Sequence, residues 1–441
     1  MHWTNSSVIR LAQDNNPIEV MESRVRALSL AARDKGWSGP PYDPVELARL
    51  LDLPIEARSD IADARTLAKG DKLVIEYNPL RPRARVKFSI AHEIAHSVFP
   101  DCAESIRNRG GSPELSEDDW QLEMLCNIGA AELLMPSGSF PEVSNSTLSM
   151  DRLLALRRTY DVSTEALLVR ISKISTAPCA AFCASSHKGP YKIDYLIPSN
   201  GWAPKIRAGQ RLPEKTVVAD ANAIGFTSMG DEEWGDHEKV HVECVALSPY
   251  PGSLIPRVVG LIRPSSPVES RPVLFQEVFG DALNPRGGAP CIVAHIVPDS
   301  SAAWGGWGFA AQIKKRYPEV WRTYQNMAEA EGLPLPLGKC YRGRLSEDMY
   351  LLNMVAQRGV GQSNTPRLRY VALETCLDHL AEMSKELSAS VHMPRIGTGH
   401  AGGDWEVIRE LIADILVKQG VPVTVYSLPS EGAVKMRNKS K

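Results

Sequence analysis

Two histidines and a glutamate lie close together in the first third of the sequence. His92, Glu93 and His96 form the pattern HExxH, in which the histidines are four residues apart. On a helix, residues i and i+4 share one face, so both imidazoles can reach one zinc ion while the glutamate lies beside an activated water. The pattern predicts peptide hydrolysis in which Glu93 takes the proton of that water. The alternative is a pair of hydrogen-bonded core histidines.

A catalytic zinc usually has three protein ligands and one open position, so a third ligand must come from another element. The next predicted helix, at about 117–135, offers Glu123. It lies in an apolar line with Trp120, Asn127, Ala131 and Leu134. An acidic residue in such a line indicates a role beyond solvation, and Glu123 is therefore the preferred third ligand.

Other acidic residues nearby are weaker candidates for that ligand. Glu132 lies off the apolar line and is expected to be solvated. The first turn of the helix holds further acids, where the helix dipole alone explains them. The remaining candidates are Glu117, Asp118 and Asp119 in that turn, and Asp101 and Glu104 just after the HExxH helix.

Three sequence blocks together resemble the ImmA/IrrE family of zinc metallopeptidases. They are KLVIEYNP (72–79), FSIAHEIAHSVF (88–99) and EMLCNIGAAELLMP (123–136). The resemblance covers about residues 20–175. It implies that His92, His96 and Glu123 bind zinc and that Glu93 is the general base. Members of this family cut repressor-type transcription factors and thereby switch on stress or mobile-element genes.

Two local features of this part concern packing and substrate. Gly129 departs from the family, which usually has phenylalanine there, and we expect this to affect packing more than chemistry. The strand at 73–77 is either an edge strand, on which an extended substrate could pair, or an internal strand.

Two glycine-rich loops follow apolar strands in the last third of the sequence. The strand CIVAHIV (291–297) leads into a loop with Gly305, Gly306 and Gly308, and the strand SVHM (390–393) leads into PRIGTGHAGGDW (394–405). Such loops let backbone N–H groups approach a phosphate, so two of them in one α/β module predict a diphosphate between them. Tight turns without a ligand are the alternative.

Four blocks here resemble a macrodomain, the ADP-ribose-binding fold, over roughly 273–428. They are GDAL (280–283), IVAHIV, YLLNMVAQ (350–357) and the second glycine loop. The resemblance implies that Asp281 hydrogen-bonds the adenine, and that Asp404 and His295 stand near the distal ribose as candidates for hydrolysis. The implied phosphate-loop residues are Gly305, Gly306, Gly308, Gly397, Thr398, Gly399 and His400.

One departure limits the chemistry expected there. A hydrolase branch of this family forms a covalent sugar adduct through a lysine on the central strand, and YLLNMVAQ has no lysine. Lysine-dependent removal of ADP-ribose is therefore not expected. Binding without chemistry and Asp404-assisted hydrolysis both remain, and Asp404 also occupies an N-cap position of the following helix.

The chain of 441 residues divides into three predicted parts. Residues 18–176 form the metallopeptidase domain with a helical appendage, 177–268 form a β-rich middle module, and 269–430 form the macrodomain. The predicted fold class is therefore multidomain α+β and α/β. It combines a zincin-like helical/β metallopeptidase domain, the β-rich module and a three-layer α/β/α macrodomain.

Two weaker signals lie between the sites. The helical pair at 147–175 resembles a helix-turn-helix but lacks a basic recognition face, so direct nucleic-acid binding is not expected. Cys179, Cys183, His237 and His241 offer a second metal site. The apolar surroundings of the two cysteines favour buried structural thiols instead.

Composition sets the remaining bounds. Fifty Lys and Arg residues against 52 Asp and Glu residues indicate neither a nucleic-acid nor a membrane-surface protein. With scattered cysteines, no secretory signal and no membrane-spanning run, we expect a cytoplasmic protein. The sequence predicts a zinc endopeptidase that cleaves a repressor-type regulator, with a macrodomain that binds ADP-ribose or ADP-ribosylated partners and gates or targets proteolysis. The alternative is a macrodomain-centred ADP-ribose reader, or an ADP-ribosyl or phosphate hydrolase, with a non-proteolytic zinc domain.

Overall fold

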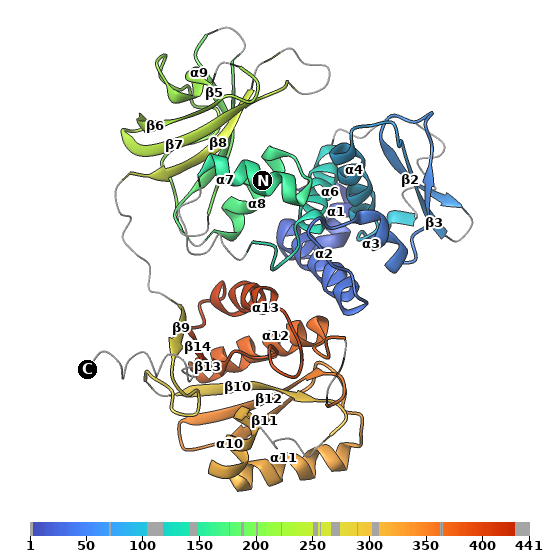
Figure 1. Ribbon diagram of the computed structural model, residues 1–441, viewed down its shortest axis with the longest axis vertical. Coiled ribbons are helices and arrows are strands. Elements are labelled where there is room, and N and C mark those ends of the chain that lie inside the picture. The colour runs from blue at the N-terminus through green and yellow to red at the C-terminus, as the bar shows by residue number, and fades with distance from the viewer. Residues whose placement is uncertain are drawn as a thin grey trace, which may run out of the picture. The chain divides into compact units, whose positions relative to one another are not determined.

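The computed structural model forms two compact units, which are described separately (Figure 1). The N-terminal unit comprises Met1–Ala32, Trp37–Pro136 and Phe140–Arg271, and the C-terminal unit comprises Arg33–Gly36, Ser137–Ser139 and Pro272–Lys441. The structure describes residues 3–69, 72–103, 118–140, 149–175, 177–186, 189–199, 202–221, 223–249, 255, 257–265, 274–288, 290–301, 308–361, 363 and 365–427.

Helices build the first part of the N-terminal unit. They are α1 (Ser6–Ala12), α2 (Pro17–Asp34), α3 (Pro44–Leu50), α4 (Arg83–His96), α6 (Asp119–Leu134), α7 (Met150–Tyr160) and α8 (Thr164–Ile174). The HExxH helix α4 begins earlier than the sequence pattern indicates and ends at the second histidine. Ile90 and Ile94 are fully buried and form the core face of α4.

A small sheet lies beside these helices. Its described strands are β1 (Ile55–Ala57), β2 (Ala64–Lys69) and β3 (Lys72–Tyr77), in the order β1-β3-β2. Strand β3 pairs in parallel with β1 and antiparallel with β2, so it is internal. Of the two interpretations of residues 73–77, the edge strand is therefore wrong, and β2 is the edge strand that follows it in the sheet.

Ion pairs join helices α7 and α8 to helices α4 and α6. Glu132 of α6 pairs with Arg170 of α8 at 2.8 Å, and each side chain is only 9% exposed. The expectation that Glu132 is solvated is therefore wrong, because the partner arginine lies far along the chain and periodicity cannot reveal it. Lys87 of α4 reaches Asp161 at the end of α7, at 2.9 Å.

The predicted β-rich part is a five-stranded antiparallel sheet within the described residues, in the order β5-β4-β8-β7-β6. The core that contains Leu167 of α8 continues into Cys183 and Val259 of this sheet. The sheet thus packs on the helical appendage. The elements are β4 (Ala180–Ser185), β5 (Lys192–Pro198), α9 (Val217–Asp220), β6 (Thr227–Trp234), β7 (Glu238–Leu247) and β8 (Arg257–Pro264).

The C-terminal unit has the three-layer α/β/α architecture expected from its alternating pattern. Its described strands form a six-stranded sheet in the order β11-β12-β10-β13-β14-β9. Figure 1 shows α12 and α13 on one face of this sheet and α10 and α11 on the other. The strands are β9 (Phe275–Phe279), β10 (Cys291–Pro298), β11 (Cys340–Arg344), β12 (Met349–Gln357), β13 (Ser390–Pro394) and β14 (Val423–Ser427).

The helices of this unit complete the layers. They are α10 (Gly308–Arg316), α11 (Pro318–Glu331), α12 (Tyr370–Leu387) and α13 (Trp405–Ile412), which continues as the π-helical turn η1 (Ala413–Val417). No helix in the described part of the chain combines the length and the apolar composition needed to span a membrane.

Parallel pairing sets the position of the predicted ligand loops. Strands β10, β13, β14 and β9 are parallel neighbours in that order. Their carboxyl ends therefore lie along one edge of the sheet. The segment GDAL after β9, the loop after β10 and the loop after β13 all leave the sheet at this edge, which we call the carboxyl edge.

Candidate functional site: a metal centre and a second, glycine-rich edge

The structure brings the two histidines of α4 and a carboxylate of α6 together. The Nε2 atoms of His92 and His96 are 3.1 Å apart. Glu123 places Oε2 at 3.0 Å from Nε2 of His92 and Oε1 at 3.6 Å from Nε2 of His96. These side chains come from two helices that pack against each other, so the arrangement depends on the α4–α6 contact.

The spacing of these atoms fits a bound zinc ion. Donor atoms at 2.0–2.3 Å from a tetrahedral zinc are separated from one another by roughly 3.3–3.7 Å. The donor atoms of His92, His96 and Glu123 are 3.0–3.6 Å apart, which is close to these values. Two imidazoles and a carboxylate also match the donor set of catalytic zinc sites that keep an open position.

A fourth donor, which the sequence analysis passed over, lies in the same cluster. Cys126, one helical turn after Glu123, has its sulfur within 4.8 Å of a nitrogen of both His92 and His96. Together with His92 and His96, Cys126 forms a group of three side chains in the described part of the chain that could hold a metal ion. The signal was present in the sequence, because residues i and i+3 of a helix lie on the same side.

Asn127 orients the first histidine. Its Oδ1 lies 3.0 Å from Nδ1 of His92 and accepts a hydrogen bond from it. This bond leaves Nε2 as the nitrogen that faces Glu123 and His96, which is the tautomer a metal ligand needs. Burial lowers the pKa of His92, but the Glu123 hydrogen bond and the charges of Glu93 and Glu123 outweigh burial, so the net pKa is raised.

Glu93 is held by the neighbouring sheet. Its Oε2 accepts a 2.7 Å hydrogen bond from the Thr66 hydroxyl on the edge strand β2. Burial raises the pKa of Glu93, and the hydrogen bonds from Thr66 oppose this shift. A raised carboxyl pKa suits a group that accepts a proton and later returns it.

The predicted apolar line of α6 differs from the observed one. Trp120 is 50% exposed and Asn127 is exposed, whereas Leu122, Leu125 and Leu133 are buried. Helix α6 is apolar on several sides, so its sequence periodicity does not single out one face. Glu123 lies at the border of the core, beside the histidines, rather than within an apolar stripe.

Gly129 has a packing role. A Cβ at this position would lie 2.9 Å from Cβ of Ala95 on α4 and 3.2 Å from Cγ2 of Val25. A larger residue would push the two helices apart. The glycine therefore permits a close approach of α4 and α6 near His92, His96 and Glu123.

The weaker metal candidates within the described residues have other partners. Asp101 is buried and accepts a hydrogen bond from the Ser7 hydroxyl at 2.8 Å. Glu104 and Glu117 lie outside the described residues. In the β-rich sheet, Cys183 donates its thiol hydrogen to Asp194, and His241 Nδ1 lies 3.0 Å from Asp231.

At the carboxyl edge of the C-terminal unit, Asp281 already has protein partners. Its Oδ1 accepts a hydrogen bond from the backbone N–H of Leu283 at 2.9 Å, and its Oδ2 pairs with Arg316 at 2.7 Å. An adenine amino group at this position would share or replace the arginine contact. The carboxylate therefore stands at the expected edge in a prearranged orientation.

The second glycine loop is tightly closed at the same edge. Gly397 has φ +74°, and the N–H of Gly403 donates to its carbonyl at 2.8 Å. A Cβ at Gly403 would lie 2.3 Å from a methyl of Leu368, so this position requires glycine. The Thr398 hydroxyl donates to the carbonyl of Arg395, and the next two residues, Gly399 and His400, are exposed.

The first glycine loop is only partly described. Gly305 and Gly306 lie outside the described residues. Gly308 is the first residue of α10 and has φ +64°, a left-handed conformation that favours glycine.

Asp404 and His295 have structural partners of their own. The Asp404 carboxylate caps α13 by accepting the N–H of Glu406 at 2.9 Å, which is the N-cap alternative. His295 is buried in the middle of β10, and its Nε2 donates to Oδ1 of Asn353 on β12 at 2.6 Å. Burial lowers the pKa of His295 to about 4, so this imidazole is neutral. A catalytic role for either residue stays a prediction.

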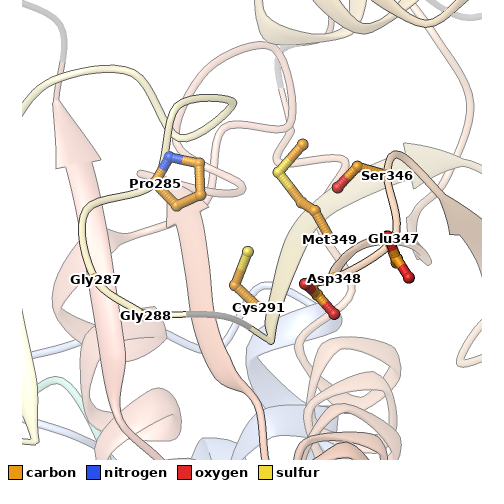
Figure 2. Close-up of a pocket in the computed structure, with 8 residues that line it drawn as sticks. All are labelled: Pro285, Gly287, Gly288, Cys291, Ser346, Glu347, Asp348 and Met349. Carbon is orange, nitrogen blue, oxygen red and sulfur yellow. The ribbon is translucent and has the colours of Figure 1, made fainter.

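A cavity of about 370 Å³ lies at the opposite edge of the same sheet. Figure 2 shows Cys291 and Met349, at the amino ends of β10 and β12, beside Asp348 and Pro285. Because β10 and β12 are parallel, this cavity is separated from the glycine loops by the length of the strands.

The N-terminal unit is similar to known metallopeptidases. Residues 54–172 match the IrrE N-terminal-like domain. The radiation response metalloprotease IrrE of Deinococcus deserti is 30% identical over 180 residues, which are 39% of this chain and 62% of that protein.

The C-terminal unit has different relatives. The chromodomain-helicase-DNA-binding protein 1-like of Mus musculus is 29% identical over 163 residues, 35% of this chain, and the DNA ADP-ribosyl glycohydrolase of Mycobacterium tuberculosis is 28% identical over 133 residues, 29% of it. The chain spans only 18% and 36% of these two relatives. A solved macrodomain protein from Streptomyces coelicolor is 32% identical, with a TM-score of 0.31, covering 35% of this chain and 99% of that one.

Both resemblances drawn from the sequence motifs are thus found, each in its own part of the chain. The chain is similar to the IrrE N-terminal-like domain and to the metalloprotease IrrE at residues 54–172, and its α/β/α unit further along is similar in sequence to a DNA ADP-ribosyl glycohydrolase and a macrodomain protein.

Proposed function

We propose that this protein is a zinc-dependent endopeptidase that cleaves a repressor-type regulator, and that its macrodomain-like unit binds ADP-ribose or an ADP-ribosylated partner to direct or gate that cleavage. The observation that carries the peptidase part is the cluster of His92, His96 and Glu123, whose donor atoms are 3.0–3.6 Å apart. Glu93 stands beside it on the same helix, as a general base must.

Each residue of the proposed site has a separate role. Zinc bound by His92, His96 and Glu123 would acidify water and polarise the peptide carbonyl. Glu93 accepts the proton of the attacking water and delivers it to the leaving amine. Thr66 keeps the Glu93 carboxylate oriented through its 2.7 Å hydrogen bond, and Asn127 keeps His92 in the required tautomer.

Strand β2 is the element best placed to hold an extended substrate. It is an edge strand of the described sheet and carries Thr66, which contacts the proposed base. A substrate strand paired with β2 would run past Glu93. Main-chain pairing of this kind selects extended, unstructured segments, such as the exposed linker of a two-domain repressor.

The decisive test replaces Glu93 by glutamine. The Glu93→Gln protein should retain zinc, because its ligands are intact, and should lose proteolysis by about two to four orders of magnitude. Newly formed protein N-termini in cells that express the wild type or this variant identify the substrate. Glu19→Gln on the exposed face of α2 is the matched control. Undiminished cleavage by Glu93→Gln would refute the mechanism.

The ADP-ribose part of the proposal is supported by the carboxyl edge. Asp281 and both glycine loops follow parallel strands that end on that edge. Calorimetric titration of the full chain with ADP-ribose should show saturable binding that Asp281→Asn weakens. Proteolysis with and without the ligand then tests gating. No binding in the wild type would mean that the likeness to macrodomains extends to the fold alone.

A second candidate function is hydrolysis at the carboxyl edge. The similarity to a DNA ADP-ribosyl glycohydrolase favours it, although direct nucleic-acid binding is not expected from the charge of this chain. Release of ADP-ribose from a modified oligonucleotide or protein would support this candidate if it is lost in Asp404→Ala and kept in Glu93→Gln. The cap role of Asp404 requires Asp404→Asn as a control that still caps α13.

A further inference from the structure

We propose that Cys126 is a fourth protein ligand of the metal in the resting site, so that the thiolate must leave the metal before water can be activated there. This inference rests on the proposed zinc site and deepens it by assigning a further ligand and a consequence for regulation. It concerns the thiol on α6, one helical turn beyond Glu123.

The Cys126 sulfur lies close to both histidines of α4. The Sγ atom of Cys126 and a ring nitrogen of each histidine lie within 4.8 Å of one another. A sulfur and a nitrogen bound to the same zinc ion are roughly 3.5 Å apart, so the sulfur has to move by at most about 1.3 Å towards each histidine nitrogen to reach that separation. Glu123 and Cys126, three residues apart on one helix, thus both lie close to His92 and His96.

The second observation is the close packing of helices α4 and α6. Gly129 follows Cys126 by three residues on α6, and a Cβ there would lie 2.9 Å from Ala95 of the HExxH helix. The absence of a side chain lets α6 approach α4 closely on this side. Cys126 is fully buried in the same core that contains Ala95. Gly129 thus permits the close approach of α6 to α4, and Cys126 provides a sulfur on the same helix.

The chemistry of the four donor side chains also suits a closed zinc site. Thiolate is a strong zinc ligand, and a zinc ion with four protein ligands is typical of closed structural sites, whereas catalytic sites keep one position for water. Two neutral imidazoles, one carboxylate and one thiolate also balance the charge of a divalent ion in a buried position. With Cys126 bound, water has no coordination position, and Glu93 has no proton to accept.

The test uses the full chain loaded with cobalt(II), whose spectrum reports its ligands. The wild type should show a thiolate-to-cobalt charge-transfer band in the near ultraviolet. Cys126→Ala should lose this band while it keeps one metal ion per chain, and Cys102→Ala, at another buried thiol of the same core, should keep it. Azide added to the cobalt proteins should change the visible spectrum of Cys126→Ala and leave the wild type unchanged, because only the variant has an open position.

The outcomes separate this inference from the proposed function. A cobalt protein without the charge-transfer band, and with the same azide response in the wild type and Cys126→Ala, overturns the thiolate ligand but leaves the peptidase proposal standing. Failure of the wild type to bind cobalt or zinc at all overturns both. Retention of the band in Glu123→Gln, together with its loss in Cys126→Ala, assigns the band to the thiolate.

Discussion

The histidines in the two halves of this protein lie in opposite environments. In the N-terminal unit, His92 and His96 face each other and a carboxylate, with donor atoms 3.0–3.6 Å apart. In the C-terminal unit, His295 and His392 lie within parallel strands, and each is hydrogen-bonded to neutral partners. Burial lowers the pKa of both strand histidines to about 4.

Neighbouring carboxylates, rather than burial, distinguish a histidine that could bind a metal ion. Burial disfavours the charged imidazole in both places, but carboxylates next to His92 reverse the shift of its pKa. A site that stabilises a positive charge on a histidine also stabilises a metal cation between histidines. His295, beside Asn353 and the ring of Phe309, has no such environment among its described contacts.

The largest effect that separates the two regions is on metal content. His92→Ala should abolish stoichiometric zinc binding, because it removes one of the proposed ligands. His295→Ala should leave the metal content unchanged. Elemental analysis of the two purified variants beside the wild type makes the measurement. Equal zinc in all three proteins would remove the basis of the comparison.

Acid pH should weaken the C-terminal unit through its strand histidines. The pKa of His295 and of His392 is about 4 in the folded protein, against about 6.5 for an unperturbed histidine. Between these values the unfolded chain binds more protons, so stability falls as the pH drops from about 6.5 towards 4. At pH 5 the loss is about 2 kcal/mol for each histidine.

Denaturant unfolding of the full chain at several pH values tests this expectation. His392→Asn removes one titrating ring and can keep a hydrogen bond to the Tyr426 hydroxyl. Its C-terminal transition should therefore lose less stability between pH 7 and pH 5 than that of the wild type. The same slope in both proteins would show that His392 is not responsible.

A smaller effect is expected at Asn127, which contacts a histidine of the proposed metal site. Asn127→Ala removes the acceptor that orients His92 and should weaken metal affinity about 10–100-fold. Chelator competition measures the affinity. Asn127→Asp keeps an acceptor at the same place and should restore most of it. If both variants bind as tightly as the wild type, the tautomer of His92 is set by other contacts.

The smallest expected effect concerns Thr66, which touches only the proposed base. Thr66→Val removes a hydrogen bond that lowers the pKa of Glu93. The loss of one such bond corresponds to about 1 kcal/mol, or roughly fivefold in kcat/KM. The acid limb of the pH–rate profile should move to higher pH, since more Glu93 is protonated at a given pH. An unshifted limb with reduced activity would indicate a structural role for Thr66 alone.

The fold of each part was accessible to prediction for different reasons. The HExxH helix, the strand at 72–77 and the alternating strands and helices after 273 have clear local patterns, and the structure confirms them. Strand order was not accessible in the same way, because pairing joins distant segments. The internal position of β3 and the partnership of Glu132 with Arg170 are both long-range contacts.

The sequence by itself determined which chemically active side chains and loops the protein contains. Histidines at i and i+4 with a glutamate between them, and glycine loops after parallel strands, have these properties in any context. The tertiary structure alone decided which side chains meet. Close packing of α4 and α6 at Gly129 brings Glu123 and Cys126 to the histidines, and cross-strand register joins His295 to Asn353 instead. Ligand sets depend on separations of a few ångströms between elements far apart in the chain, and helix or strand periodicity carries no information on those distances.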